Sequence, residues 1–462
     1  MMVHIYTNGF RIIQFQLVCY LYFLHKIKTR MKNSFLPFYF LLTTLVFAYG
    51  QTNTALLLSA PKQVISPVSK PELAGVNAER LKRIDDNINQ WMSDGRLNGA
   101  VALVIRNGKI VYNKAFGYDD IAKTKPLRTD NIYRIASQSK AITSAAIMML
   151  YEEGKFLLDD PVSRYIPEFS KQQVLDKFNP ADSSYTTVPA KSDITIRQLL
   201  THTAGVGYPE IGSPEAKAIF SKSKLIAGLG AAEGRILADD VKTIAKLPLF
   251  HQPGEKYLYG WNIDVLGYLV EIFSGMSLDQ FFKKRIFEPL GMNDTYFYLP
   301  ESKHSRLVNL FIEKDKKLVN SQDEVPLLAN YPKFKGTYYS GGAGLSSTAM
   351  DYAIFLQMML NGGIYNGKRL LSANTVRMMT MNQIGDIRGT NGFGLGFGIT
   401  SEKGSTLLPT PEGVFEWGGA FSTTYWADPK EKLVGIFYRQ LWGSSLGNIA
   451  DKFKVLVYQS LE

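Results

Sequence analysis

The sequence is poor in cysteine and histidine. Its single cysteine, Cys19, lies in the first 50 residues, so the rest of the chain has no disulfide, thiol nucleophile or thiolate metal site. Beyond residue 50 only His202, His251 and His304 occur, far apart in sequence. Because structural and catalytic zinc sites use mainly these two residue types, this inventory argues against a metal site. We expect neither a metal nor a cofactor.

The chain also lacks a dense block of basic residues. Its net charge of +11 depends partly on residues 1–50, which carry five Lys or Arg and no Asp or Glu. The remainder has 47 basic and 41 acidic residues, and its basic residues are dispersed. This pattern argues against a nucleic-acid partner. Hydrophobic residues at 45% and charged residues at 20% are typical of a globular protein with a large core.

Residues 31–50 have the pattern of a secretory signal peptide. A short basic start precedes an apolar run over 35–47, and Ala48-Tyr49-Gly50 offers small residues for cleavage before Gln51. The run is short for a membrane span. We therefore expect a periplasmic or extracellular protein after cleavage near Gln51. Residues 1–30 are interpreted as an upstream extension, in which an anchor over 10–24 is weakened by Arg11 and two glutamines, and residues 51–75 as a flexible tether.

From residue 77 the sequence alternates between helical and strand-like patterns. The predicted elements are helices over 78–93, 137–150, 264–273 and 446–461, a helix opened by a capping box at Ser277–Gln280 and bounded by Pro289, and strands over 100–105, 109–115, 414–417, 420–426 and 433–439. Asn107-Gly108 predicts a tight hairpin between the first two strands. Residues 301–336 are interpreted as a surface excursion. The layout predicts one α/β (α+β) domain over 76–462, interrupted by an all-helical lobe, with a cleft between the two parts.

Ser137 and Lys140 stand three residues apart at the start of a predicted helix. Residues i and i+3 share a helix face, so the hydroxyl and the amine should be neighbours. A serine hydroxyl needs a base, and a partly desolvated lysine can be one. The same spacing recurs at Ser221 and Lys224, where a solvated surface helix is the simpler interpretation.

Histidine-based catalysis fits the sequence poorly. The stretch 443–447 matches G-x-S-x-G, but that arrangement needs a histidine after the serine, and none follows His304. His202 is interpreted as a packed or capping residue. Tyr259, on a turn before an amphipathic helix, offers a phenol that could shuttle a proton beside an ammonium. Gly418-Gly419 in a strand-like run indicates either close backbone approach or a bend in the sheet.

Six stretches in this order resemble the serine hydrolases of the class C β-lactamase and penicillin-binding-protein superfamily, the nearest group being the family VIII carboxylesterases. They lie between Leu81 and the C-terminus, at 135–140, 199–205, 259–267, 287–292, 340–347 and 417–419. The resemblance implies a β-lactamase-like fold, with an antiparallel sheet flanked by helices. It implies Ser137 as nucleophile, Lys140 with Tyr259 as the proton-handling pair, and the N–H groups of Ser137 and Ala420 as the oxyanion hole. Which member of the pair is the base stays open.

Two positions depart from the β-lactamase pattern. Trp261 stands where those enzymes have the asparagine of Tyr-x-Asn, with Asn262 one residue late, and Trp417 replaces the lysine of the third motif. Both changes remove polar contacts suited to a β-lactam and add aromatic surface, although Asn262 could swing into the missing amide's place. The expected substrate-binding residues are Trp417, Gly418, Gly419, Trp261 and Asn262.

The expected activity is hydrolysis of carboxylic esters with short or medium acyl chains through an acyl-Ser137 intermediate. The alternatives are a β-lactamase or D-amino-acid peptidase (carboxypeptidase) that uses the same residues, or a catalytically idle cell-wall binder. The expected partner is a small-molecule ester or a cell-wall-type substrate. We expect a monomer or a weak oligomer.

Overall fold

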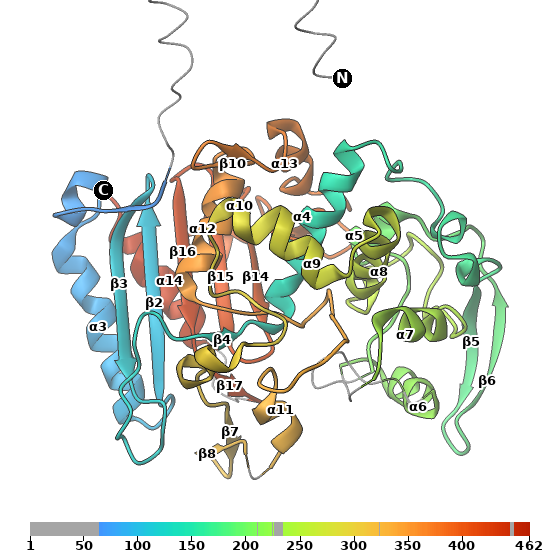
Figure 1. Cartoon of the computed structure of the whole chain (residues 1–462), viewed down its shortest axis with the longest axis horizontal. Helices are drawn as coiled ribbons and strands as arrows, with labels where there is room; N and C mark the ends of the chain where they lie inside the picture. Colours follow the sequence, from blue (N-terminus) through green and yellow to red (C-terminus); the bar gives the residue numbers. More distant parts are fainter. Residues whose placement is uncertain (1–63, 210, 224, 226–233, 323, 444–447) are drawn as a thin grey trace, which may run out of the picture. The chain divides into compact units, whose positions relative to one another are not determined.

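The computed structural model describes residues 64–462, apart from residues 210, 224, 226–233, 323 and 444–447 (Figure 1). The predicted extension, the signal peptide, most of the tether and the serines of the G-x-S-x-G stretch lie outside the described residues. No helix among those described is long and apolar enough to cross a membrane.

An eight-stranded sheet in the order β1-β3-β2-β16-β15-β14-β13-β12 forms one layer of the protein. Its strands are β1 (Ser66–Pro67), β2 (Gly99–Arg106), β3 (Lys109–Gly117), β12 (Gly392–Phe393), β13 (Gly398–Ile399), β14 (Phe415–Gly419), β15 (Thr423–Asp428) and β16 (Leu433–Tyr438). Every neighbouring pair is antiparallel except β1 and β3, which are parallel. The predicted antiparallel sheet is therefore correct except at this edge. Within the stretch assigned to the flexible tether, residues 66–67 instead form β1 and residues 71–74 form a short 3-10 helix.

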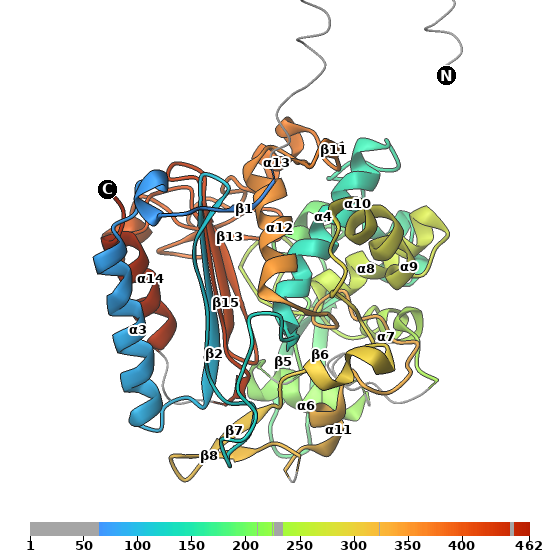
Figure 2. The same cartoon turned by 60° about the vertical axis from the view of Figure 1, so that its left-hand side comes forward.

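The β2–β3 hairpin forms as its sequence predicts. Asn107 and Gly108 have φ angles of 54° and 72°, the left-handed conformations that a two-residue turn needs between twisted strands. Successive residues of β2 point to opposite faces, where they join two separate hydrophobic cores. Helices α3 (Ala78–Ser93) and α14 (Ile449–Gln459) cover one face, and α4 (Ser139–Glu152) and α12 (Ala349–Leu360) lie on the other (Figure 2).

The second part of the fold is mainly helical. Its helices are α5 (Ile196–Leu200), α6 (Pro214–Lys222), α7 (Leu237–Ile244), α8 (Asn262–Ser274), α9 (Leu278–Phe282) and α10 (Glu288–Leu290). It also contains a projecting hairpin of β5 (Gln173–Asn179) and β6 (Ser184–Pro189), so the all-helical expectation is wrong here (Figure 1). Every residue of β6 is exposed. The sequence of β6 therefore lacks the apolar alternation by which half-buried strands are detected.

Two further predictions about local structure are corrected. The helix that begins at α9 continues through a π-helical turn (Lys283–Phe287) and through Pro289, and it ends at Gly291 with a φ of 76°. The capping box at Ser277 does not form, because its hydroxyl donates to Asp279 instead.

The stretch interpreted as a surface excursion is partly ordered. It contains β7 (Phe311–Lys314), β8 (Lys317–Asn320) and α11 (Pro326–Asn330), and β7 also pairs with β17 (Leu441–Trp442). The remaining short elements are β4 (Tyr133–Arg134), β9 (Ser346–Ser347), β10 (Ile364–Tyr365), β11 (Lys368–Arg369) and α13 (Ala373–Met379).

Helix α4 joins the two parts of the fold. All twelve of its residues from Ser139 to Leu150 are buried, because it lies between the sheet and α8 (Figures 1 and 2). Short β4 and a 3-10 turn (Ala136–Gln138) lead into it. The first turn of this central helix is where the serine-lysine motif falls.

Candidate active site

Ser137 lies in the 3-10 turn, and Lys140 lies in the first turn of α4. The α-helix begins two residues later than predicted, after Ala136 adopts a left-handed φ of 44° that is uncommon for a residue with a side chain. Lys140 is 2% exposed, and its Nζ lies 3.4 Å from Ser137 Oγ. Ser137 itself is partly exposed and lines a cavity. A buried amine is therefore next to a hydroxyl that a ligand can reach.

The Lys140 amine is held in place by a buried loop. Its Nζ donates to the Gly342 carbonyl at 2.7 Å. Asp264 Oδ1 accepts from the Ser340 hydroxyl at 2.7 Å and from the Gly342 N–H at 3.1 Å, which fixes that loop. Burial raises the pKa of Asp264, while the nearby charge of Lys140 and these hydrogen bonds act in the opposite direction. No separate role is predicted for Asp264 from the sequence.

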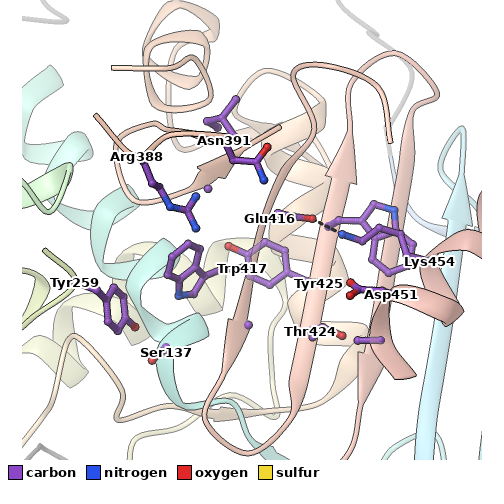
Figure 3. A pocket seen from close by; sticks show the side chains of 15 residues that line it. Ser137, Tyr259, Arg388, Asn391, Glu416, Trp417, Thr424, Tyr425, Asp451 and Lys454 are labelled. Atoms are coloured by element: carbon purple, nitrogen blue, oxygen red, sulfur yellow. Dashed lines mark hydrogen bonds and ion pairs between the residues drawn. The ribbon is translucent and has the colours of Figure 1, made fainter. Parts of the chain in front are cut away.

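The Tyr259 ring stands beside Lys140, with its centroid 4.7 Å from Nζ. It stacks parallel to Tyr208 at 5.9 Å and lies 5.5 Å from Trp417. Its hydroxyl is buried without a hydrogen-bond partner among the described residues, and Figure 3 shows it on the side of Ser137. The structure thus brings together the three groups predicted from the sequence, which are the Ser137 hydroxyl, the Lys140 amine and the Tyr259 phenol. Their catalytic roles remain predictions.

His202 contacts the segment that carries Tyr259. Its Nδ1 lies 2.9 Å from the Asn262 side-chain nitrogen and accepts from the Gly260 N–H at 3.4 Å. Complete burial, together with the charges of Lys140 and Arg388, lowers the pKa of His202 well below its usual value, so the imidazole is neutral. The prediction of a packed histidine is confirmed.

Trp261 and Asn262 do not line the cavity. Trp261 is 1% exposed and packs against Tyr208 and Phe220, with ring centroids 6.5 Å and 6.4 Å away. Asn262 is fully buried and bonded to His202. The prediction that these two residues contact the substrate is therefore wrong. Both stand where α8 begins, and the start of that helix turns their side chains into the core.

The glycine pair at the end of β14 brings the strand against the serine turn. A Cβ on Gly419 would collide with the Ile135 carbonyl, so only glycine permits this approach. A Cβ on Gly418 would meet nothing closer than 3.4 Å, and Gly418 lines the cavity. Of the two alternatives that the sequence left open, close backbone approach is therefore the correct one for Gly419. Ala420 follows in an exposed turn, and none of the hydrogen bonds of the described residues uses its N–H.

The cavity beside Ser137 has a volume of about 370 Å³ (Figure 3). On the side of the helical lobe it is walled by Tyr259, Trp417 and Arg388, of which Arg388 was not predicted. On the other side of β14, Glu416 pairs with Lys454 from α14. Among the described residues no group of three or more His, Cys, Asp or Glu could hold a metal ion.

Ser221, the serine of the second serine-lysine pair, does not line this cavity. Ser221 is exposed near the end of α6, and Lys224 lies outside the described residues. His251 and His304 bond backbone carbonyls of Gln252 and Leu299.

The fold and this site define a serine hydrolase. A family model described as beta-lactamase matches residues 84–458, and the chain belongs to that family. The chain is 30% identical to the esterase EstB of Burkholderia gladioli, over 75% of this chain and 86% of that protein. It is 31% identical to a putative D-alanyl-D-alanine carboxypeptidase of Escherichia coli K12, over 76% and 79%. In fold it is similar to EstCE1, a hydrolase with promiscuous acyltransferase activity, with a TM-score of 0.70 and 24% identity over 82% of this chain and 98% of that one. The protein is a carboxylesterase-like serine hydrolase of the β-lactamase and penicillin-binding-protein superfamily.

Proposed function

We propose that the protein hydrolyses carboxylic esters with short or medium acyl chains through an acyl-Ser137 intermediate. The observation that carries the proposal is the 3.4 Å contact between Lys140 Nζ and Ser137 Oγ at the edge of an aromatic-walled cavity. A buried amine and a buried phenol lie on one side of the hydroxyl, and the glycine-containing end of β14 lies on the other.

In acylation, Ser137 Oγ attacks the ester carbonyl carbon and its proton passes to the Lys140–Tyr259 pair. Charge on the carbonyl oxygen is stabilised by the N–H groups of Ser137 and Ala420. The intermediate collapses when the alcohol leaves with that proton. Water then attacks the acyl carbon by the reverse proton route, which releases the acid and restores the serine.

The walls of the cavity favour an ester over an amide substrate. Trp417 and Tyr259 offer apolar ring surface that gains from burial against an acyl chain. Asn262 is fully buried and bonded to His202, so its side-chain amide is not available to pair with a substrate amide. The similarity to the esterase EstB supports the same class. The similarity to a putative carboxypeptidase makes D-alanyl peptide hydrolysis the second candidate.

Covalent labelling tests the nucleophile. A fluorophosphonate should label wild-type protein on the peptide that contains Ser137, and Ser137→Ala should lose the label while Ser221→Ala keeps it. A label on another serine would refute the assignment, and a folded protein without any label would favour an idle binder.

A kinetic panel tests the substrate class. We expect p-nitrophenyl butyrate to be hydrolysed with a kcat/KM at least a hundredfold above those of nitrocefin and a D-alanyl-D-alanine peptide, because selectivity follows the polar groups that a site can pair in the transition state. Equal or better efficiency on either amide substrate would replace the esterase proposal with the corresponding alternative.

We also propose that the protein is exported. The support is the short basic start, the apolar run and the small residues before Gln51. Intact mass of protein recovered from the periplasm or the medium should correspond to a chain that begins near Gln51. A chain that retains residues 1–50 and sediments with membranes would contradict this proposal.

A further inference from the structure

Arg388 is a cation in the wall of the cavity that the mechanism above does not use. It lines the same cavity as Ser137, Tyr259 and Trp417 (Figure 3). The chain places it in the loop before β12, where nothing in the surrounding sequence marks it as functional. Its side chain is partly exposed, so a molecule in the cavity can reach it.

Aromatic rings fix the orientation of this guanidinium. Its central carbon lies 5.2 Å from the ring centroids of Tyr257 and Trp417 and 5.7 Å from that of Phe393. Rings at this distance attract a cation and restrict a side chain that would otherwise be mobile. Arg388 is therefore already held in place before a ligand binds, which reduces the ordering cost of binding.

The charge of Arg388 is not neutralised by an acidic partner. None of the ion pairs of the described residues includes it. Two carboxylates line the cavity: Glu416 is paired with Lys454, and Asp451 takes part in none of these ion pairs. Arg388 Nη1 donates to the Gly392 carbonyl at 3.1 Å, and a guanidinium has five N–H donors. Donors thus remain for a ligand.

The positive field of Arg388 reaches the rest of the site. Its charge contributes to the lowered pKa of His202 and opposes the rise that burial causes in the pKa of Tyr257. An anionic group in the cavity would therefore meet a favourable potential as well as free donors.

We propose that Arg388 forms an anion-binding subsite that selects esters carrying a carboxylate away from the scissile bond. A planar carboxylate matches the planar guanidinium, and charge-assisted hydrogen bonds of this kind are stronger than neutral ones. The substrate would place its apolar part against Trp417 and its carboxylate against Arg388. This inference rests on the proposed esterase function and names its substrate class.

Two pairs of esters that differ in charge test the subsite. The acyl pair is the p-nitrophenyl monoester of adipic acid and p-nitrophenyl hexanoate. The alcohol pair is 4-butyryloxybenzoate and its methyl ester. In at least one pair, wild-type protein should prefer the charged member, and Arg388→Gln should lower the charged-to-neutral ratio of kcat/KM at least tenfold. Added salt should lower the same ratio in wild type, because it screens the pairing.

Arg377→Gln is the matched control, because Arg377 is an exposed arginine on α13 that does not line the cavity. It removes the same charge and should leave the ratio unchanged. An equal effect of Arg388→Gln on both members of both pairs would overturn the subsite, as would a wild-type preference for the neutral member in both. Failure of wild type to hydrolyse any of the four esters would instead refute the esterase function on which the subsite depends.

Discussion

Replacement of Asp264 by alanine should lower kcat roughly a hundredfold without removing any catalytic group. Asp264 accepts hydrogen bonds from Ser340 and from the Gly342 N–H, and the carbonyl of the same Gly342 accepts from Lys140. Loss of the carboxylate frees the loop, and the amine loses its fixed place beside Ser137. Asp264 is therefore a positioning residue that acts on Lys140 through a single residue, Gly342.

The magnitude follows from the contacts. Hydrogen bonds to a charged group contribute about 1.5–3 kcal/mol each, so loss of two should lower the free energy of unfolding by about 3–6 kcal/mol. A displacement of Lys140 by about 1 Å would reduce kcat roughly a hundredfold, because proton transfer depends on close geometry. Asp264→Asn keeps one acceptor oxygen and should retain more activity than the alanine variant.

The assay is p-nitrophenyl butyrate hydrolysis at a temperature where urea titration shows each variant to be folded. Asp351→Ala is the matched control, since Asp351 is also buried and accepts two hydrogen bonds, from the Asp294 N–H and the Thr295 hydroxyl. It should be destabilised but retain most of its kcat. Near-normal kcat in folded Asp264→Ala, or an equal loss of kcat in Asp351→Ala, would refute the positioning role.

Three further predictions concern the serine turn and its support. Ser137→Ala should abolish measurable turnover, and Lys140→Ala and Tyr259→Phe should each lower kcat/KM by roughly a thousandfold, without additive losses in the double variant. Additive losses would mean that the two groups act in separate steps. Because burial keeps His202 neutral, only the unfolded chain takes up its proton, so the free energy of unfolding should decrease as the pH falls below about 6.5. His202→Asn, which retains an acceptor and tolerates a φ of 56°, should flatten that decrease in urea titrations between pH 7 and pH 5, and an unchanged slope would contradict the assignment. Gly419→Ala should push β14 away from the serine turn and cost at least a hundredfold in kcat; wild-type activity in a folded variant would show that the close approach is dispensable.

Elements with strong local signals were predictable. Helix α3 begins and ends as predicted, because Asn77 caps its first turn and its apolar residues recur at helical spacing. The β2–β3 hairpin follows from Asn107-Gly108 in the same way. In both cases the residues that determine the structure are neighbours in the chain.

Elements that depend on distant partners were not predictable. Strand β1 exists because it pairs with β3, more than forty residues away, and its own two residues carry no strand pattern. Pro289 was predicted to end a helix, yet the helix passes through a π-helical turn and continues through Pro289 to Leu290. Periodicity alone cannot reveal either arrangement.

The residues of the site fall into the same two groups, those that local sequence predicts and those that depend on distant parts of the chain. Ser137 and Lys140 lie three residues apart, so their contact follows from helix geometry. Arg388 reaches the cavity from a loop about 250 residues downstream, and the sequence around it carries no recognisable motif. Its role becomes visible only when the fold places it beside Trp417.

The burial of Trp261 removes one of the two tryptophans expected at the site, and the remaining aromatic rings still favour an ester substrate. Aromatic surface at the site now comes from Trp417 and Tyr259, since Trp261 belongs to the core. For Asn262 to assist an amide substrate, its side chain would have to leave His202. The neutral imidazole would then lose its closest partner inside the protein, and an unsatisfied buried polar group costs about 1–3 kcal/mol. Asn262 is the side chain that could have taken the place of the amide in the β-lactamase motif. It is therefore held away from that place by its hydrogen bond to His202.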